Sequence, residues 1–328
     1  MYSTGKRDIE TISECISQEL DLFEKAYKEE FQRGDAVLLP VLEYVGKEKG
    51  KCIRPSLFFL CQGLINKPKL TSIPVAVLLE LLHIATLVHD DVVDQSVTRR
   101  GKDTLNALWG DNVSVLLGDY LLAKVLALGV SVPWTSVLSV ISRAVMGMGK
   151  EELRQVLETP EKKFTITNYL RNIHGKTAGF MSASSELGGI VMEADNTVIV
   201  QLRRLGTAFG MAFQIRDDIL DITGSEDILG KPVGQDMANG KITLPLILAL
   251  EQVPTEEKEK VLQRQSAPKS KNGMWIREFI ERYNGVQLAQ QKAEIFINKA
   301  LQILMTFPSS VYRDALQKII VHDLERMG

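Results

Sequence analysis

The sequence lacks the features that mark secreted and nucleic-acid-binding proteins. Its three cysteines, Cys15, Cys52 and Cys61, are an odd number with no CxxC pair, which predicts free thiols in a reducing, cytoplasmic compartment rather than disulfides or a zinc site. The first residues lack the apolar core of a secretory signal peptide. A net charge of −2 argues against a general nucleic-acid-binding surface.

Long uninterrupted apolar runs are also missing. The stretch 73–88 contains Glu80 and His83 and is shorter than the ~20 residues that usually span a bilayer. The stretch 113–134 is interrupted by Asp119 and Lys124. We therefore expect no transmembrane segment, and both stretches are predicted to be helices buried in a soluble core.

Strand-like alternation is scarce, whereas helical spacing of apolar residues dominates. Leu78, Leu81, Leu82 and Ala85 recur at helical intervals. The candidate connections at 66–69, 159–163 and 266–273 are too short to be domain linkers. The sequence predicts a single all-α domain over residues 1–328, built as a bundle of mostly antiparallel helices.

The most informative feature present is a pattern, DDxxD, that occurs twice, each time after an apolar run. In a helix its first and last Asp are four residues apart and share a face, where their repulsion weakens the helix. A hard dication relieves that repulsion, and Mg²⁺ combines one or two carboxylates with water and substrate phosphates. The pattern thus predicts several Mg²⁺ ions around a diphosphate, held by a first cassette (Asp90, Asp91 and Asp94) and a second cassette (Asp217, Asp218 and Asp221).

Two other interpretations of the acids are a solvated helix face and a calcium loop. One DDxxD copy alone is more often a solvated face, but two copies after buried-looking runs are not typical of one. An EF-hand loop needs alternating oxygen ligands, a central Gly and a terminal Glu. The pairs Val92–Val93 and Ile219–Leu220 do not supply that pattern.

Basic and hydroxyl side chains recur around the acids and can bind phosphate without a metal. Arg offers a bidentate fork and Lys a point charge. Each alone is more often a solvated surface group, and His83, two helical turns before Asp90, more often a core histidine. Together they predict a phosphate-binding set: Lys51, Arg54, His83, Arg99, Arg100, Lys176, Thr177, Lys231 and Lys241. His89 is expected either to have a structural role or to support the metal ligands from behind.

The chain resembles the trans-type isoprenyl (polyprenyl) diphosphate synthases, in the medium- and long-chain branch of octaprenyl and solanesyl synthases. Motifs in the family's order run from about Gly50 to Pro245, including HDDVVD, TRRG, NALWG and LLGD. In the family's Gly-Gly-Lys-Arg-x-Arg-Pro motif, Lys49 and Cys52 replace a Gly and the first Arg. The resemblance implies an isoprenoid synthase fold, with helices around a central cavity, and a homodimer.

The resemblance also implies roles for individual residues. Three Mg²⁺ ions are the expected cofactors. Their direct ligands would be Asp90, Asp94 and Asp217, with support from Asp91, Asp218 and Asp221. The allylic diphosphate would be held by the ions together with Arg99, Lys176, Thr177, Gln214, Lys231 and Lys241. Isopentenyl diphosphate would be held by Lys51, Arg54, His83 and Arg100.

The implied activity is Mg²⁺-dependent condensation of isopentenyl diphosphate with an allylic diphosphate, yielding a medium- or long-chain all-trans polyprenyl diphosphate. The resemblance also suggests peripheral membrane contact during product release. Three alternatives stay open: a terpene cyclase, a non-catalytic partner subunit of a heteromeric synthase, and a shorter-chain synthase that makes farnesyl or geranylgeranyl diphosphate. A cyclase usually has a different second metal motif, and a non-catalytic subunit is expected to lose site residues.

Product length is the last property that the resemblance addresses. Ala85 lies about 7.5 Å before Asp90 along a helix, where short-chain members place a bulky aromatic. Ala85 and its neighbour Thr86 are both small. We expect an open channel and a hexaprenyl to decaprenyl product, with a floor at Val145, Met146 or Met148. A tight helix–helix contact at Ala85 is the alternative.

Overall fold

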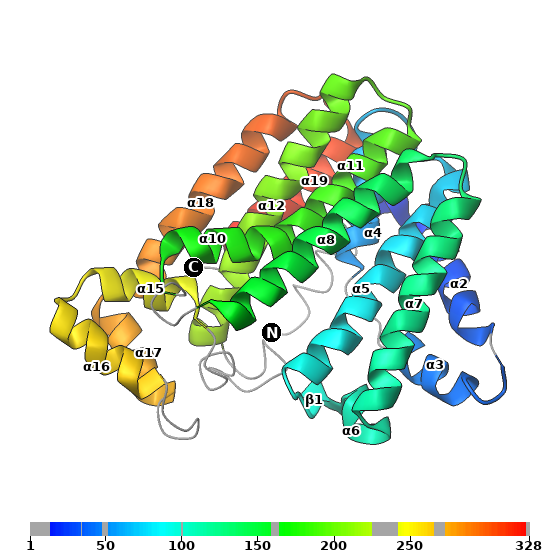
Figure 1. Cartoon of the computed structure of the whole chain (residues 1–328). Coiled ribbons are helices and arrows are strands. Elements are labelled where there is room, and N and C mark those ends of the chain that lie inside the picture. The colour runs from blue at the N-terminus through cyan, green and yellow to red at the C-terminus, as the bar shows by residue number, and fades with distance from the viewer. Residues whose placement is uncertain are drawn as a thin grey trace. The chain divides into compact units, whose positions relative to one another are not determined.

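The computed structural model describes residues 14–33, 35–47, 52–99, 101–158, 164–224, 242–265 and 273–325, and these ranges are almost entirely helical (Figure 1). Apolar residues at helical spacing form its helices, so the all-α fold class is confirmed. The one pair of strands within these ranges is a short antiparallel ribbon of β1 (Thr98–Arg99) and β2 (Lys102–Asp103). Gly101 in its turn has φ +75°, which glycine adopts readily.

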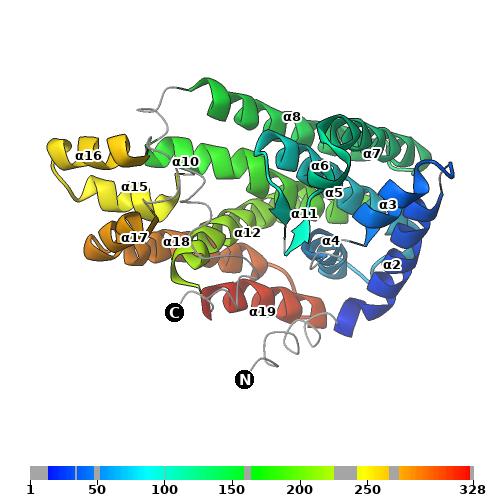
Figure 2. The ribbon, with the colours of Figure 1, turned by 90° about the horizontal axis from the view of Figure 1, so that it is seen from below.

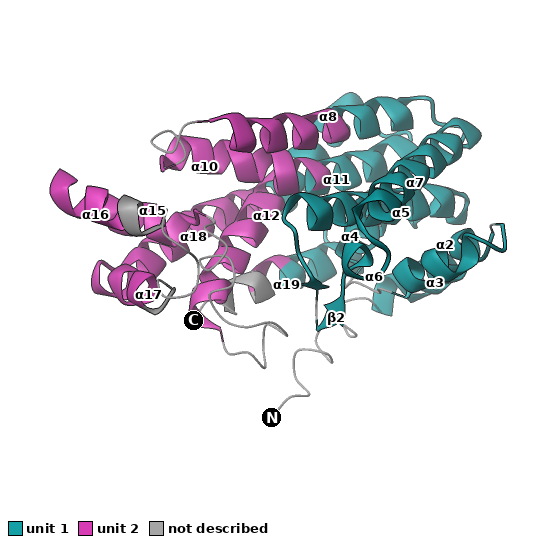
Figure 3. Cartoon of the chain, turned by 60° about the horizontal axis from the view of Figure 1, so that its bottom comes forward, with its two compact units in different colours: residues 1–143, 181–206, 303–319 teal, residues 144–180, 207–302, 320–328 magenta. Residues whose placement is uncertain are grey.

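The chain divides into two compact units (Figure 3): unit 1 comprises residues 1–143, 181–206 and 303–319, and unit 2 comprises 144–180, 207–302 and 320–328. The prediction of a single domain over 1–328 stays a prediction. Unit 1 contains η1 (Glu14–Ile16), α2 (Ser17–Gln32), α3 (Leu39–Gly46), α4 (Ile53–Gly63), η2 (Leu70–Ser72), α5 (Ile73–Val93), the ribbon, α6 (Leu105–Trp109) and α7 (Asp111–Ser131).

Unit 2 contains α10 (Ile166–Ile173), the π-helical segment η3 (His174–Ala178), α15 (Leu244–Glu251), α16 (Thr255–Gln265) and α17 (Gly273–Arg282). Five further helices contribute residues to both units: α8 (Ser136–Leu157), α11 (Gly179–Val191), α12 (Asn196–Thr223), α18 (Gly285–Leu304) and α19 (Val311–Glu325).

In unit 1, α5 and α7 pack side by side and antiparallel (Figures 1 and 2). Gly118 of α7 lies against His89 of α5, and Gly129 lies near Leu78. From Gly118 to Gly129 the residue number in α7 rises by eleven, whereas from His89 to Leu78 the residue number in α5 falls by eleven. The two helices therefore run in opposite directions. Because α5 is buried along most of its length, this pair fixes where the end of α5 lies in unit 1.

The π-helical segment η3 in unit 2 was not anticipated from the sequence. A Cβ at Gly175 would come within 2.3 Å of Glu151 Cγ and 3.1 Å of the Gly147 carbonyl oxygen, so η3 packs tightly on α8. The glycine allows that approach. Lys176 and Thr177 lie in this same π-helical segment.

Among the residues that the structure describes, two helices are long and apolar enough to cross a membrane by length and composition alone: residues 70–93 and α7. The first has 72% of its apolar window buried, as expected for a core helix. The prediction that both apolar stretches are buried in the core was wrong for α7, because only 33% of its apolar window is buried. Its Leu116, Leu126 and Val130 are exposed in this chain. Apolar composition does not reveal whether a helix is covered by its own chain.

The cysteine prediction is confirmed as far as disulfides are concerned. Cys15, Cys52 and Cys61 all lie within the described ranges, and none forms a disulfide. Burial raises the pKa of the Cys61 thiol to about 12, so it stays protonated and packs as a small apolar group.

Candidate active site

The first cassette occupies the last turn of α5. The Asp94 amide donates to the Asp90 carbonyl oxygen at 2.8 Å, so the helical turn continues through Asp94 although α5 ends at Val93. The predicted four-residue spacing on one face is therefore confirmed. Asp90 is half-buried, Asp94 is exposed, and Asp91 is buried. The first and last acids are accessible to solvent, and the middle acid is not.

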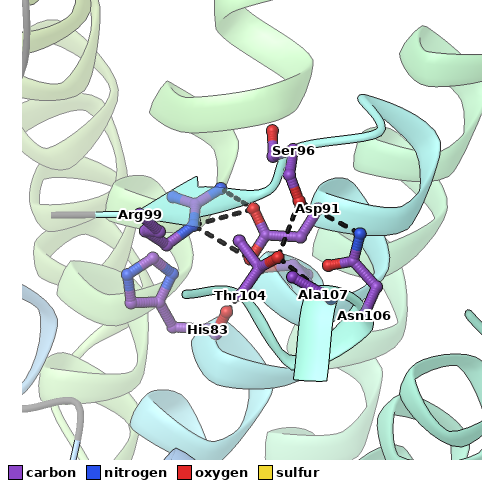
Figure 4. A network of polar contacts seen from close by, with 8 residues as sticks. His83, Asp91, Ser96, Arg99, Thr104, Asn106 and Ala107 are labelled. Carbon is purple, nitrogen blue, oxygen red and sulfur yellow. Dashed lines mark hydrogen bonds and ion pairs between the residues drawn. The ribbon is translucent and has the colours of Figure 1, made fainter. Parts of the chain in front are cut away.

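Asp91 is held by Arg99 of β1 (Figure 4). The Arg99 Nε donates to both Asp91 oxygens at 2.9 and 3.1 Å, and its Nη2 donates to Oδ1 at 2.8 Å. A bidentate arginine–carboxylate pair of this kind fixes both partners. Arg99 therefore lies directly beside the first cassette and balances the charge of its middle acid.

The segment that carries Arg99 is tied back to α6 (Figure 4). The Ser96 carbonyl oxygen accepts from the Thr104 hydroxyl at 2.6 Å and from Asn106 Nδ2 at 3.0 Å. Thr104 also caps α6, because its hydroxyl oxygen accepts from the Ala107 amide at 3.4 Å. Asn106 begins the NALWG motif, so part of this motif fixes the loop after the cassette.

His89 packs against α7, which agrees with its structural assignment. Its Nε2 lies 3.1 Å from the Val115 carbonyl oxygen and 3.6 Å from Asp119 Oδ1. A Cβ at Gly118 would come within 2.1 Å of that ring nitrogen. The glycine of LLGD therefore makes room for the histidine of HDDVVD.

The remaining candidates in unit 1 lie on α4 and α5. Arg54 is in the first turn of α4, after Cys52, whose φ of +47° is left-handed. The Thr86 hydroxyl donates to the His83 carbonyl oxygen at 2.7 Å, as β-hydroxyls in helices often do. Ala85 is fully buried.

A cavity of about 480 Å³ in unit 1 contains no residue of the acidic cassette. It lies between α2, α3, α5 and the start of α4, and Phe23, Tyr27 and Phe31 form one of its walls. This cavity therefore does not coincide with the chemistry that the acids suggest.

The second cassette occupies the last two turns of α12. Its Asp217 side chain is 44% exposed, Asp218 is buried, and Asp221 is fully buried. Arg216 donates to Asp217 Oδ1 at 2.9 Å, and its guanidinium lies 4.4 Å from the Phe213 ring centre. Equal helical spacing in the two cassettes thus does not give equal exposure, because the surroundings of α12 cover its last acid.

Four side chains of unit 2 form a continuous hydrogen-bond chain. The Tyr169 hydroxyl of α10 donates to Asp218 Oδ2 at 2.7 Å, and Gln214 Nε2 donates to Oδ1 at 3.0 Å. The Thr177 hydroxyl donates to Gln214 Oε1 at 2.7 Å. Burial, and next the charge of Asp218, raise the pKa of Tyr169 well above its ordinary value, so its hydroxyl keeps its proton. We call this chain the Tyr169–Thr177 relay.

Lys176 lies beside Thr177 and forms an ion pair with Glu152 of α8 at 2.5 Å. Nearby, Arg171 of α10 bridges Glu151 at 3.1 Å and Glu158 at 2.5 Å. In this structure, the ion pair with Glu152 therefore holds the Lys176 side chain toward α8. Its side chain is 38% exposed, so it remains accessible to a ligand.

The structure groups the described candidates into two sets. Unit 1 holds the first cassette with Arg54, His83, Ala85, Thr86 and Arg99, and unit 2 holds the second cassette with Lys176, Thr177 and Gln214. Lys51, Arg100, Lys231 and Lys241 lie outside the described residues. Sequence reasoning missed Tyr169, Glu152 and Arg216. Only Arg216 had a local signal, because it directly precedes the second cassette.

The donor set suits a hard cation. Within the described ranges, no three His, Cys, Asp or Glu side chains gather closely enough to enclose a metal ion by themselves. Mg²⁺ does not require such a cage, because it keeps waters and takes substrate phosphates as ligands. The accessible carboxylates Asp90, Asp94 and Asp217 fit that mode of binding.

Comparison with known proteins connects most of the chain to one group. Residues 35–281 match the Polyprenyl synthetase family. Octaprenyl diphosphate synthase of Escherichia coli is 32% identical over 94% of this chain and 96% of its own. Heptaprenyl diphosphate synthase component 2 of Bacillus subtilis is 31% identical over 93% of this chain and 87% of its own. The crystal structure of a polyprenyl synthase from Caulobacter crescentus, complexed with calcium and isoprenyl diphosphate, is 29% identical and has a TM-score of 0.89 over 98% of both chains.

Proposed function

Because this chain belongs to the polyprenyl synthetase family, we propose that it condenses isopentenyl diphosphate with an allylic diphosphate to form a medium- or long-chain all-trans polyprenyl diphosphate. One observation carries the proposal most directly. Both DDxxD cassettes are present, and in each the middle acid is held by donors of the protein, Asp91 by Arg99 and Asp218 by Tyr169. The other acids of the proposed metal site, Asp90, Asp94 and Asp217, are accessible to solvent and hence to a ligand.

Three Mg²⁺ ions would be held by Asp90, Asp94 and Asp217, and would neutralise the diphosphate charge that develops as the allylic C–O bond breaks. Arg99, Lys176, Thr177, Gln214, Lys231 and Lys241 are proposed to bind the allylic diphosphate. Lys51, Arg54, His83 and Arg100 are proposed to bind isopentenyl diphosphate. The double bond of the latter attacks the allylic cation, a C–C bond forms, and the proton that is then lost goes to the departed diphosphate.

The decisive experiment is product analysis of the chain by itself. Incubation with isopentenyl diphosphate, an allylic primer and Mg²⁺ should yield a polyprenyl diphosphate. Absence of any product would support a non-catalytic subunit, an alternative that the Bacillus subtilis relative keeps open because it is named a component. A cyclic hydrocarbon would support a terpene cyclase. A product that stops at farnesyl or geranylgeranyl diphosphate would support the shorter-chain alternative.

The two substrates should respond to different residues. Arg54→Ala should raise the KM for isopentenyl diphosphate roughly tenfold or more, because a hydrogen bond to a charged group contributes about 1.5–3 kcal/mol. Lys176→Ala should change the KM for the allylic substrate or the turnover number. Steady-state kinetics with each substrate varied in turn would measure both effects. Arg277→Ala, which removes an exposed arginine paired with Glu281, is the control. Equal weakening of both substrates by both variants would contradict the two-pocket assignment.

We further propose a cytoplasmic homodimer that contacts membranes only peripherally, when its apolar product leaves. The exposed apolar face of α7, formed by Val115, Leu116, Leu126 and Val130, supports the dimer. Exposed large apolar side chains that gather on one helix often mark an interaction site.

A charge placed on this face should separate the subunits. Leu116→Glu should shift the protein from dimer to monomer in sedimentation equilibrium, because a carboxylate would be buried without a partner. Ile295→Glu, at an exposed position of α18, should leave the mass unchanged. A monomeric unsubstituted chain, or a dimeric Leu116→Glu variant, would place the subunit contact elsewhere or exclude it.

A further inference from the structure

We propose, on the basis of the proposed function, that Tyr44 is a positioning residue for isopentenyl diphosphate, because it joins α3 to the ribbon of β1 and β2 and so keeps two sides of that substrate's pocket together. The Tyr44 hydroxyl donates to the Asp103 carbonyl oxygen at 2.6 Å, across fifty-nine positions of sequence. Tyr44 lies near the end of α3, and Asp103 ends β2.

The ribbon offers Tyr44 an acceptor on its outer edge. The Thr104 amide donates to the Val97 carbonyl oxygen at 3.0 Å, so Val97 and Thr104 form a hydrogen-bonded pair. Such pairs alternate along an antiparallel ladder with pairs that exchange no hydrogen bond, and Thr98 with Asp103 is the next pair. The Asp103 carbonyl oxygen therefore points away from β1, and Tyr44 is its donor. Because a short two-stranded ribbon is marginally stable, a tie at this edge holds it in place.

A ring contact supports the same junction. Tyr44 and Trp109 of α6 meet edge to face, with ring centres 5.1 Å apart, which is a geometry that aromatic pairs prefer. Tyr44 therefore contacts both the strand and the helix that follow the first cassette. The ties of the ribbon to Asp91 and Ser96 stay within residues 91–107, whereas Tyr44 comes from a distant part of the chain.

This junction lies between residues that are proposed to hold isopentenyl diphosphate. α3 leads toward the start of α4, where Arg54 lies, and the end of α3, the start of α4 and Glu80 of α5 border one cavity. His83 is one turn after Glu80 on α5 and lies beside Arg99 of the ribbon (Figure 4). One side of the pocket is thus continuous with α3, and the other side adjoins the ribbon.

Tyr44→Phe separates these two sides with little other disturbance, because it keeps the ring against Trp109 and deletes only the hydroxyl. Arg99 stays in place beside the first cassette, since Asp91 binds it without help from Tyr44. The arrangement in which α3 and the ribbon are tied is then populated for less of the time. If isopentenyl diphosphate binds to that arrangement, its apparent Kd rises in proportion as the population falls.

The binding test is calorimetric titration of isopentenyl diphosphate into enzyme that already holds Mg²⁺ and an unreactive thio analogue of the allylic substrate. Tyr44→Phe should raise the Kd roughly 2–10-fold, the range that corresponds to one ordinary intramolecular hydrogen bond. The Kd of the thio analogue should stay the same. Tyr44→Leu, which also removes the ring contact with Trp109, should raise the Kd for isopentenyl diphosphate further.

Steady-state kinetics should show the same split between the substrates. In Tyr44→Phe the KM for isopentenyl diphosphate should rise, while kcat stays near its original value, because saturating substrate restores the tied arrangement. The matched control is Tyr283→Phe, because the Tyr283 hydroxyl donates to Glu257 Oε1 at 3.0 Å, away from the proposed site residues. It should change neither constant. An unchanged affinity for isopentenyl diphosphate in Tyr44→Phe, or an equal loss for both substrates, would overturn the proposal.

Amide hydrogen exchange without substrate separates failure of this proposal from failure of the proposed function. Tyr44→Phe should speed exchange in the peptides that contain β1 and β2, because the ribbon opens more often when it is released from α3. Tyr283→Phe should not. Equal exchange in Tyr44→Phe and the unsubstituted chain would overturn the role of Tyr44. If exchange is faster but the unsubstituted chain makes no prenyl product, the proposed function fails and the tie between α3 and the ribbon stands.

Discussion

Replacing Asp90 or Asp217 by alanine is expected to lower the turnover number by roughly 10²–10³-fold, the usual cost of losing one direct stabiliser of leaving-group charge. Both acids are accessible to solvent, so neither variant leaves a cavity in a core. The folded state should be kept, and for Asp90 it should gain slightly, since repulsion with Asp94 disappears. Steady-state kinetics at saturating Mg²⁺ would measure the loss.

The control for this prediction is Asp21→Ala, which removes an exposed acid of α2. Circular dichroism should show the same helical signal for all three variants, and Asp90→Ala should unfold at a slightly higher temperature than the unsubstituted chain. Near-normal turnover in Asp90→Ala or Asp217→Ala would contradict the assignment of three ions to the two cassettes. A loss of helical signal would instead show that the acids have a structural role.

Ala85→Phe is expected to shorten the product from the hexaprenyl to decaprenyl range to about farnesyl or geranylgeranyl diphosphate. A phenyl ring five residues before Asp90, about 7.5 Å away along the helix axis, would block a growing chain without reaching the acids of the first cassette. The first condensations should therefore proceed at a near-normal rate. Chromatography of the products after dephosphorylation would give the chain-length distribution.

Ala85→Phe is also expected to destabilise the folded protein, because Ala85 has no exposed surface. Overpacking a core typically lowers the free energy of unfolding by about 1–3 kcal/mol. Thr86→Phe, at the half-buried neighbouring position, is the companion variant. Of the positions expected to form the floor of the channel, Met148 is buried and Met146 is 65% exposed, so Met148 is the better candidate. An unchanged product distribution in a folded Ala85→Phe enzyme would place the stop elsewhere and favour a tight helix–helix contact at Ala85.

The sequence predicted the elements more securely than it predicted their surroundings. The helical spacing of apolar residues predicted α5 and α12, because this spacing depends only on neighbouring residues. The acidic cassettes lie at the ends of these two helices, as expected. The same period suggested that α7 is buried, which was wrong. Periodicity reports which face of a helix is apolar and does not report what covers that face.

The spacing of residues in the sequence did not predict contacts between segments that are far apart along the chain. Nothing around residue 169 indicates that a tyrosine there meets Asp218, forty-nine residues later. The same applies to the pair of Lys176 and Glu152, which requires α8 and the π-helical segment to pack together. Such partners become visible only when the helices are placed in space.

The sequence by itself determined the chemistry of this protein: two acidic cassettes, a set of basic residues and an all-helical chain, since these follow from residue type and local spacing. The tertiary structure decided how the acids differ. Asp91 is held by Arg99, Asp218 is held by Tyr169 and Gln214, and Asp221 is fully buried. The physical reason is that a carboxylate's role depends on the donors and the solvent around it, and other helices supply both.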